Sequence, residues 1–213
     1  MPNWCDCSMV IYTDDESKKD NIQKVYNLLA EQLKRGRQIE EENRTLPASQ
    51  RKHLHWDTYE VYKTLCPELT EEEICGGNLY YIRGTIFDVR LDEIDNTIHV
   101  GYETAWEPMT EGWGILLAKY GLKQVTIAEE PACEVYVNTD IDGRWFKDRY
   151  IIEMCIDDNN YKEYYELIPE ALADMEKYFH KKFRSLNDFL SFVKRINDKK
   201  EGDYIVFAKF CSE

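Results

Sequence analysis

The amino-acid sequence has few glycines and prolines and no long apolar run. Ten glycines and six prolines among 213 residues are too few for a disordered chain, and a hydrophobic share of 43% is enough for a core. No apolar stretch approaches the roughly 18–20 residues that a membrane-spanning helix needs. We therefore expect one large domain, or one domain with a small extension, and no membrane partner.

The N-terminus also lacks the basic region and the following apolar region of a secretory signal. The expected location is therefore the cytoplasm, where thiols are kept reduced. The seven cysteines are an odd number and fit buried, reduced side chains better than a disulfide framework. Cys5 and Cys7 come nearest to a metal-binding pair, but a structural zinc site usually needs two such pairs.

Common catalytic motifs are missing too. The sequence contains no Gly-rich phosphate loop, no Gly-x-Ser-x-Gly and no His-Glu-x-x-His. His53 and His55 are two positions apart, a spacing that does not share a helical face. We therefore predict no catalytic residue, no metal and no cofactor, and we favour a non-enzymatic protein.

Basic residues are scarce in the middle of the chain. The net charge is −14, and residues 53–143 hold 18 acidic residues against 5 basic ones, whereas residues 144–213 hold 14 against 13. Because a phosphate backbone is bound by clustered Lys and Arg, this segment argues against direct nucleic-acid binding. It fits a basic protein partner, a cation or mimicry of nucleic acid, and it also fits a merely solvated acidic face.

Periodicity predicts a mixture of strands and helices. Apolar residues at every second position indicate strands, and apolar residues at spacings of three and four indicate helices. The predicted strands are 3–12, 79–91, 97–104, 122–128, 133–138, 145–155 and 204–210. The first predicted helix is long; residues 13–17 cap its start, and its apolar pattern ends near Gly36. The other predicted helices are 53–66, 108–120, 168–179 and 185–196. A further helix is predicted to start at 68–73.

Through residue 128 the order of these elements is βαββαβ once the extra helical segment is set aside, as in the ferredoxin-like split βαβ arrangement. We expect an α+β fold with a ferredoxin-like domain over 1–156. It would contain a helical insertion at 34–78 and an extra β-hairpin that extends the sheet. Residues 157–213 are expected to be a C-terminal helical extension that packs on the same domain and ends in a strand.

Residues 97–120 join a predicted strand to a predicted helix through an acidic and aromatic corner. Pro108 fits the start of the helix, where its missing N–H is not needed. Glu103, Trp106 and Glu107 lie between the two elements. One hypothesis is a recognition corner, in which an aromatic platform meets carboxylates. The alternative is that Trp106 fills the gap between sheet and helix, as buried aromatic residues commonly do.

Several short stretches resemble one protein family. The opening, M-P-N-W-C, resembles the start of phage- and plasmid-borne proteins with a YubB-type ferredoxin-like domain. Residues 103–108 (E-T-A-W-E-P) are similar to that family's Thr-Ala-Trp-Ser-Pro corner, and residues 128–131, 140–146 and 149–150 are similar to its later blocks. The resemblance covers roughly residues 1–12 and 80–156. It implies the ferredoxin-like fold and a mobile-element setting, and it brings no established activity and no catalytic residue.

Asn138, Asp140, Asp142 and Gly143 copy the first half of an EF-hand calcium loop. The bidentate carboxylate that should close such a loop at its twelfth position is replaced by Arg149. Strands are also expected on both sides, where an EF-hand has helices. We therefore interpret this stretch as the turn of a β-hairpin.

The favoured function is a non-enzymatic acidic module that binds a basic protein, because aromatic anchors and acidic rims are common in interfaces. Three alternatives stay open. The first is mimicry of nucleic acid against a host nuclease or defence complex, and the second is a metal-dependent enzyme with carboxylates at Glu103, Glu129 and Glu130. The third is a homo-oligomer that forms through an edge strand at 204–210. The candidate surface comprises Trp56, Glu103, Trp106, Glu107, Glu129, Glu130, Asp140 and Asp142, together with Trp113.

Overall fold

The computed structural model describes residues 3–51, 58–70, 72, 84–199 and 202–212. The chain forms two compact units, Met1–Val135 and Tyr136–Glu213, and the predicted α+β class is confirmed. The expected boundary at residue 156 falls inside the second unit. The packing of residues 157–213 on the first unit stays a prediction.

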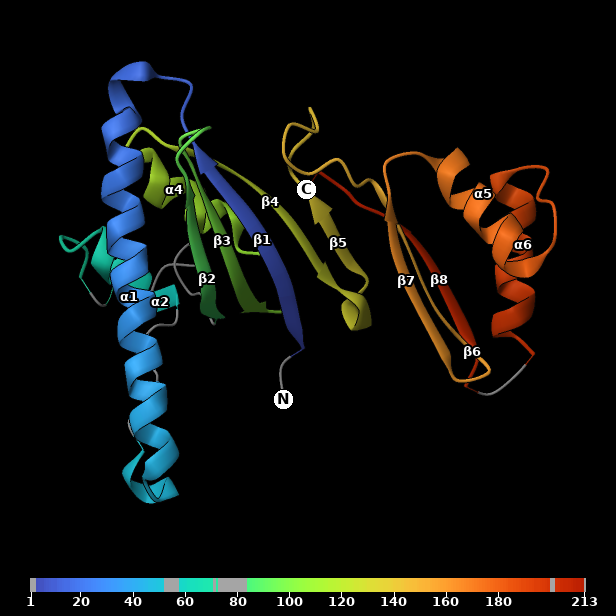
Figure 1. Cartoon of the computed structure of the whole chain (residues 1–213), viewed down its shortest axis with the longest axis horizontal. Helices are drawn as coiled ribbons and strands as arrows, with labels where there is room; N and C mark the ends of the chain where they lie inside the picture. Colours follow the sequence, from blue (N-terminus) through green and yellow to red (C-terminus); the bar gives the residue numbers. More distant parts are fainter. Residues whose placement is uncertain (1–2, 52–57, 71, 73–83, 200–201, 213) are drawn as a thin grey trace. The chain divides into compact units, whose positions relative to one another are not determined.

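A five-stranded antiparallel sheet has its first four strands in the first unit, and its fifth strand, β5, begins at the last residue of that unit (Figure 1). Its strand order is β2-β3-β1-β4-β5, so the first strand of the chain lies in the middle. The strands that were predicted from alternation are present with partly different bounds, since Cys133 belongs to a helical turn and residues 145–149 of the predicted strand 145–155 are a loop. The strands of this sheet are β1 (Trp4–Tyr12), β2 (Gly84–Asp92), β3 (Thr97–Ala105), β4 (Lys123–Glu130) and β5 (Val135–Asn138).

Alternation along β1 separates the two faces of this sheet. Cys5 and Cys7 are buried, whereas Asp6 and Ser8 between them are exposed. Cys7 pairs with Tyr102 in β3, and Tyr102 is fully buried. The cysteine side of β1 therefore faces the core, as predicted, and the Asp6 side is the open face of the sheet.

Three helices cover the buried face, namely α1 (Lys19–Thr45), α2 (Thr58–Leu65) and α4 (Thr110–Ala118). Trp113 in α4 is fully buried and lies edge-on to Tyr102, with ring centroids 5.7 Å apart. Tyr62 in α2 stacks on the other side of Trp113 at 6.4 Å. Gln32 in α1 ties the first two helices together, because its side chain donates to Glu60 O and Thr64 Oγ1.

The indole of Trp113 therefore fills the space between sheet and helix, and Trp106 does not. Trp106 is 52% exposed, so the packing alternative for that residue is wrong. The expectation that Trp113 belongs to the binding surface is also wrong, since its side chain has no exposed area. Sequence alone does not distinguish two tryptophans seven residues apart, because either could occupy the buried position.

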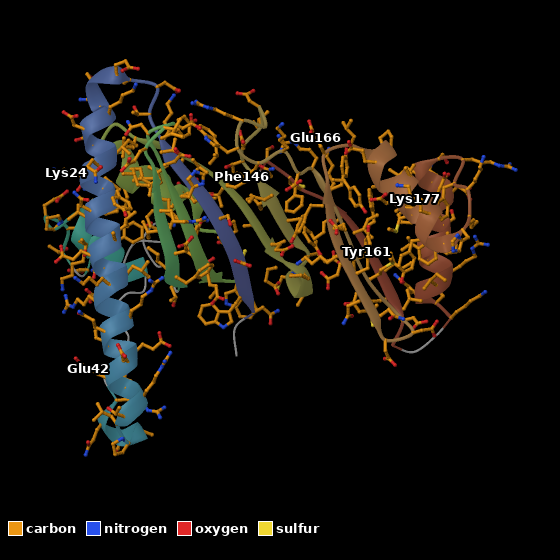
Figure 2. All side chains as sticks on the ribbon, viewed as in Figure 1. Lys24, Glu42, Phe146, Tyr161, Glu166 and Lys177 are labelled. Carbon is orange, nitrogen blue, oxygen red and sulfur yellow. The ribbon has the colours of Figure 1, made fainter. Side chains whose placement is uncertain are left out.

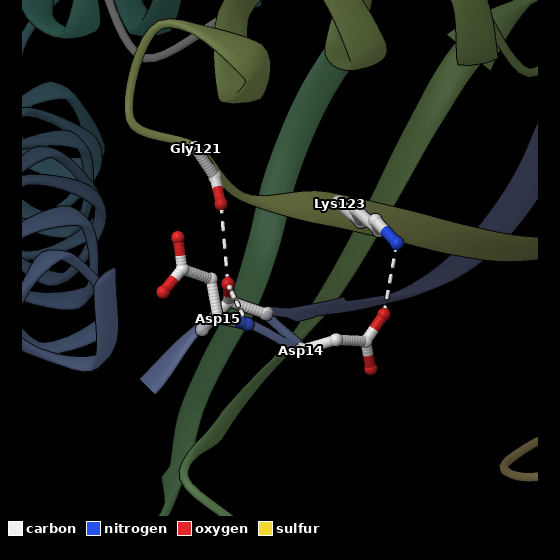
Figure 3. Close-up of polar contacts among 5 residues, drawn as sticks. Asp14, Asp15, Gly121 and Lys123 are labelled. Carbon is white, nitrogen blue, oxygen red and sulfur yellow. Dashed lines mark hydrogen bonds and ion pairs between the residues drawn. The ribbon is translucent and has the colours of Figure 1, made fainter. Parts of the chain in front are cut away.

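A short turn connects β1 to α1 and is tied to the start of β4 (Figure 3). Thr13 Oγ1 donates to Gly121 O, and the Lys123 ammonium lies 2.8 Å from a carboxylate oxygen of Asp14. Asp15 accepts a hydrogen bond from Ser17 N and so caps the helical turn Glu16–Lys18. A hydrogen bond with the Ser17 side chain, and after it this backbone bond, holds the pKa of the Asp15 carboxyl below its ordinary value. The predicted capping segment at 13–17 is thus confirmed.

Helix α1 is longer than expected, because it continues through Gly36 to Thr45. Its last turns are charged and carry an ion pair between Glu40 and Arg44 at spacing i, i+4. The predicted insertion therefore begins within this helix. Although α1 has 27 residues, neither it nor any other helix of the described ranges is long and apolar enough to cross a membrane.

The second unit contains a three-stranded sheet in the order β7-β6-β8, with two helices on one face. Its core gathers residues such as Ile152, Met154, Met175 and Phe189. The predicted helices at 168–179 and 185–196 are confirmed, and Ser185 Oγ accepts from Asp188 N as expected of an N-cap. The elements are β6 (Tyr150–Ile156), β7 (Asn159–Tyr165), α5 (Ile168–Phe179), α6 (Leu186–Asn197) and β8 (Tyr204–Lys209).

The extra hairpin forms at a different place from the one predicted. β5 and β6 lie in different sheets, and β6 instead pairs with β7 over seven positions. The turn between them holds Asp157 and Asp158, both at positive φ, as in the two-residue turns that match strand twist. β7 escaped prediction because its sequence, N-N-Y-K-E-Y-Y, is polar at most positions.

The outer edge of β8 is closed at two points. The side-chain amide of Asn197 donates to Ile205 O and accepts from Ile205 N, at 2.9 and 2.8 Å. Further along, Cys211 N donates to Tyr136 O, and Cys211 O accepts from Asn138 N. These contacts occupy backbone groups that a neighbouring strand would otherwise bond, so they weaken the hypothesis of self-association through this edge.

We predict that Trp113→Ala lowers the free energy of unfolding by about 3–5 kcal/mol, because it removes a buried aromatic side chain and leaves a cavity. Trp106→Ala is the matched control and should change it by no more than about 0.5 kcal/mol, as is usual for exposed positions. Chemical denaturation of both variants checks this. Equal losses would mean that the two indoles contribute equally to the core.

Candidate protein-binding face

Three carboxylates come together on the open face of the first sheet. Asp6 in β1 lies directly opposite Glu103 in β3 and directly opposite Glu129 in β4. Because neighbouring strands are roughly 4.8 Å apart, the three side chains form a row across the centre of the sheet. Asp6 is exposed, and Glu103 and Glu129 are partly exposed. We call Asp6, Glu103 and Glu129 the acidic row.

In the described strands, none of the residues that lie directly opposite a member of the acidic row in a neighbouring strand is basic. Thr85 in β2 lies opposite Glu103, and the next positions along the same face of β1, β3 and β4 are Ser8, Gly101 and Ile127. Like charges directly opposite one another destabilise strand pairing. The row therefore does not stabilise the sheet, and it places negative charge on the open face through exposed Asp6 and partly exposed Glu103 and Glu129, one carboxylate oxygen of Glu129 being buried.

An aromatic side chain lies beside the acidic row. The register between β2 and β3 shifts at Phe87, which is the mark of a β-bulge. The Phe87 ring then lies across Gly101, where an added Cβ would come within 2.6 Å of Phe87 Cε2. Gly101 thus provides the space that the ring occupies. Phe87 is 42% exposed, so the ring offers an apolar surface to solvent.

Trp106 follows directly after the end of β3, and its side chain is 52% exposed. Its backbone N–H donates to Asn3 O, which extends the β1–β3 pairing by one step. Its φ of 79° is unusual for a bulky residue and costs of order 1–3 kcal/mol. The corner is held by Thr104, whose hydroxyl donates to Glu107 O. The predicted corner thus brings exposed Trp106 and Glu107 to the end of the strand that carries Glu103.

Glu130 does not join the acidic row. It lies one position beyond Glu129 and so faces the opposite side of β4, where it is 4% exposed. Its carboxylate accepts from Ala132 N and Cys133 N and caps the helical turn Pro131–Cys133. Its hydrogen bond to Cys133 also raises the pKa of that thiol. The function of Glu130 in this structure is therefore a local cap.

Asp140 is also a structural residue. It is 3% exposed, and its carboxylate accepts from Trp145 N and Phe146 N at 2.6 and 2.8 Å. Asn138 contributes from the same loop, because its side-chain amide donates to Phe146 O and Asp148 O. The loop is therefore built around two buried polar side chains, and Asp142 on its outside is exposed.

Arg149, which stands where an EF-hand loop has its closing carboxylate, holds this loop together. Its guanidinium donates to Asp140 O, Ile141 O and Phe146 O at 2.6, 3.2 and 2.9 Å. A positive side chain of the chain itself thus satisfies three backbone carbonyls of the loop. The expected hairpin turn is wrong, because these bonds hold residues 139–149 as a wide loop between two sheets. Burial in this loop raises the pKa of the Asp148 carboxyl.

Metal chemistry finds little support in this arrangement. Across the described ranges, no three His, Cys, Asp or Glu side chains are grouped so that they could hold a metal ion. Of the strand-end carboxylates proposed for an enzyme, Glu103 and Glu129 flank Asp6, and Glu130 is turned away. Trp56, the remaining candidate, lies outside the described residues.

Asp6 is the residue of the acidic row that sequence reasoning missed. Its position opposite the two cysteines predicts an exposed side chain, but one acidic residue in a strand is not a signal by itself. Only the register of β1 against β3 and β4 shows that Asp6 stands between two glutamates.

Comparisons with known proteins return no match. No protein-family model matches the sequence, and neither a curated protein nor a solved structure matches it significantly. The YubB-type resemblance therefore stays a prediction.

We predict that Arg149→Met lowers the free energy of unfolding of the second unit by about 1–3 kcal/mol, because it leaves partly buried carbonyls without a donor. Lys147→Met is the matched control, since Lys147 is an exposed cation of the same loop. Thermal unfolding with and without calcium tests both variants. Similar losses in the two variants, or a calcium-dependent rise of the wild-type midpoint, would contradict this account of the loop.

Proposed function

We propose that this chain is a non-enzymatic binding module whose first unit recognises a basic protein on its open sheet face. The observation that carries the proposal is the acidic row, in which Asp6 stands between Glu103 and Glu129. Three neighbouring carboxylates without a basic residue at the paired positions attract a cationic ligand. The acidic charge around residues 53–143 adds a field that speeds the approach of such a partner.

The aromatic residues make arginine the best-fitting ligand side chain. A guanidinium binds carboxylates through two parallel hydrogen bonds and also stacks on aromatic rings. Phe87 and Trp106 are both about half exposed. The Phe87 ring lies on the face that carries the acidic row, over Gly101, and Trp106 follows the end of the strand that carries Glu103. A lysine would gain the charge attraction but less of the stacking. We therefore expect a partner rich in arginine.

We also propose that the first unit is a ferredoxin-like domain. The strand order β2-β3-β1-β4 and the helices on one face support this assignment, because the split βαβ arrangement has the same order. Together with the YubB-type resemblance, it supports a mobile-element setting. The fold itself does not imply an activity, so the function rests on the acidic row.

Mimicry of nucleic acid has weaker support. A mimic needs carboxylates that follow the spacing of backbone phosphates over a distance. The acidic row is three residues wide and then gives way to Thr85 in β2. The negative charge of the acidic row attracts a basic protein and repels the phosphates of nucleic acid, so direct binding of nucleic acid by this face is disfavoured.

The test is a triple variant, Asp6→Asn with Glu103→Gln and Glu129→Gln, assayed against an immobilised arginine-rich peptide. We expect slightly more than about tenfold weaker binding than wild type, because three surface ion pairs of roughly 0.5 kcal/mol each amount to about 1.5 kcal/mol. Wild-type binding should fall as the salt concentration rises, because the charges are solvent-exposed.

The control changes the net charge equally at another place. Glu40, Glu41 and Glu42 lie on the last turns of α1, and Glu42 is labelled in Figure 2. Substituting all three with glutamine should leave peptide binding close to wild type. If both triple variants lose the same affinity, the net charge binds the peptide and the acidic row does not. Capture of cellular partners, with release by duplex DNA, would instead support mimicry.

A further inference from the structure

The second unit carries a group of basic residues on α6 and in the loops before and after that helix. Residues 177–199 hold seven Lys or Arg and two acidic residues, although the unit as a whole is slightly acidic. Most of these cations are exposed, and five of them form no ion pair with any residue of the described ranges. We call these five the basic surface, namely Lys182, Arg184, Lys194, Arg195 and Lys199.

Helix α6 presents part of this surface together with an apolar side chain. Phe189 and Val193 are buried in the core of the second unit, so the opposite side of the helix faces solvent. That side carries Leu190, which is 38% exposed, and Lys194 lies next to it one helical turn later, at spacing i, i+4. Arg195 is also exposed and follows Lys194 on the solvent side of the helix. The exposed side of α6 therefore combines cations with an apolar contact.

This combination complements the open face of the first sheet. The acidic row would meet Lys194 and Arg195, and the exposed rings of Phe87 and Trp106 would meet Leu190. Apolar centres with charged surroundings are the usual composition of specific protein interfaces. One chain thus contains both halves of a complementary pair of surfaces.

We propose that the basic partner of the acidic row is the α6 surface of a second copy of this chain. This inference rests on the proposed function, because it names the partner of the same acidic face. The contact is heterologous, since different surfaces of the two copies meet, so it leads either to closed rings or to chains. Nucleic acid is the less favoured ligand for α6, because the second unit has 16 acidic residues against 13 basic ones.

Complementation between two variants tests this contact. The first variant is the triple Asp6→Asn, Glu103→Gln, Glu129→Gln, which keeps only the basic surface. The second is Lys194→Gln with Arg195→Gln, which keeps only the acidic row and leaves the buried side of α6 unchanged. Light scattering on full-length protein measures the mass of each variant alone and of their equimolar mixture.

Wild type is expected to increase in mass with concentration and to return to a monomer at high salt. Each variant alone should be a monomer, whereas the mixture should form a one-to-one dimer through the single intact contact. A control, Lys34→Gln with Arg35→Gln, removes the same charge from exposed positions of α1 and should associate like wild type.

Three outcomes would overturn the inference. They are a wild type that stays monomeric at every concentration, a Lys194→Gln/Arg195→Gln variant that associates like wild type, and a mixture that remains monomeric. If wild type stays monomeric but still binds the arginine-rich peptide, the proposed function survives and the partner is another protein. If it neither associates nor binds the peptide, both proposals fail.

Discussion

The pairing of β1 with strands on both sides is the constraint on which the first unit depends. Because side chains alternate along a strand, one register assigns every residue of β1 to a face. Cys5 and Cys7 then lie in the core beside Tyr102, and Asp6 lies outside between Glu103 and Glu129. A shift by one residue would bury Asp6 and expose the cysteines. The core thus fixes the register, and the register creates the acidic row.

Local patterns in the sequence predicted most of the helices and strands, but they did not predict which strands pair with one another. The alternation at 3–12 and the cap at Ser185 depend on residues close together in the chain, and both were confirmed. Strand β7 was missed because polar residues occupy most of it. The extra hairpin was misplaced because Asp-Gly is a common turn signal, whereas the bonds of Arg149 to distant carbonyls follow no local rule.

In the candidate site, too, features that depend on residues close together in the chain were predictable, and features that depend on distant residues were not. The exposure of Glu107 and the corner around Trp106 follow from residues within one short stretch. Asp6 and Glu129 are more than a hundred positions apart in the chain, so only the folded sheet brings them together. Glu130 and Asp140 illustrate the converse. Their carboxylates looked available in the sequence, but backbone amides a few residues away occupy them.

The amide of Asn197 connects the end of α6 with β8 through both backbone groups of Ile205. The helix end and the strand therefore cannot lose their order independently, and they open as one cooperative unit. We therefore expect the Ile205 N–H to exchange slowly while Asn197 at the last turn of α6 stays in place. Hydrogen exchange at this single amide thus reports the stability of the helix end, even though the amide belongs to the sheet.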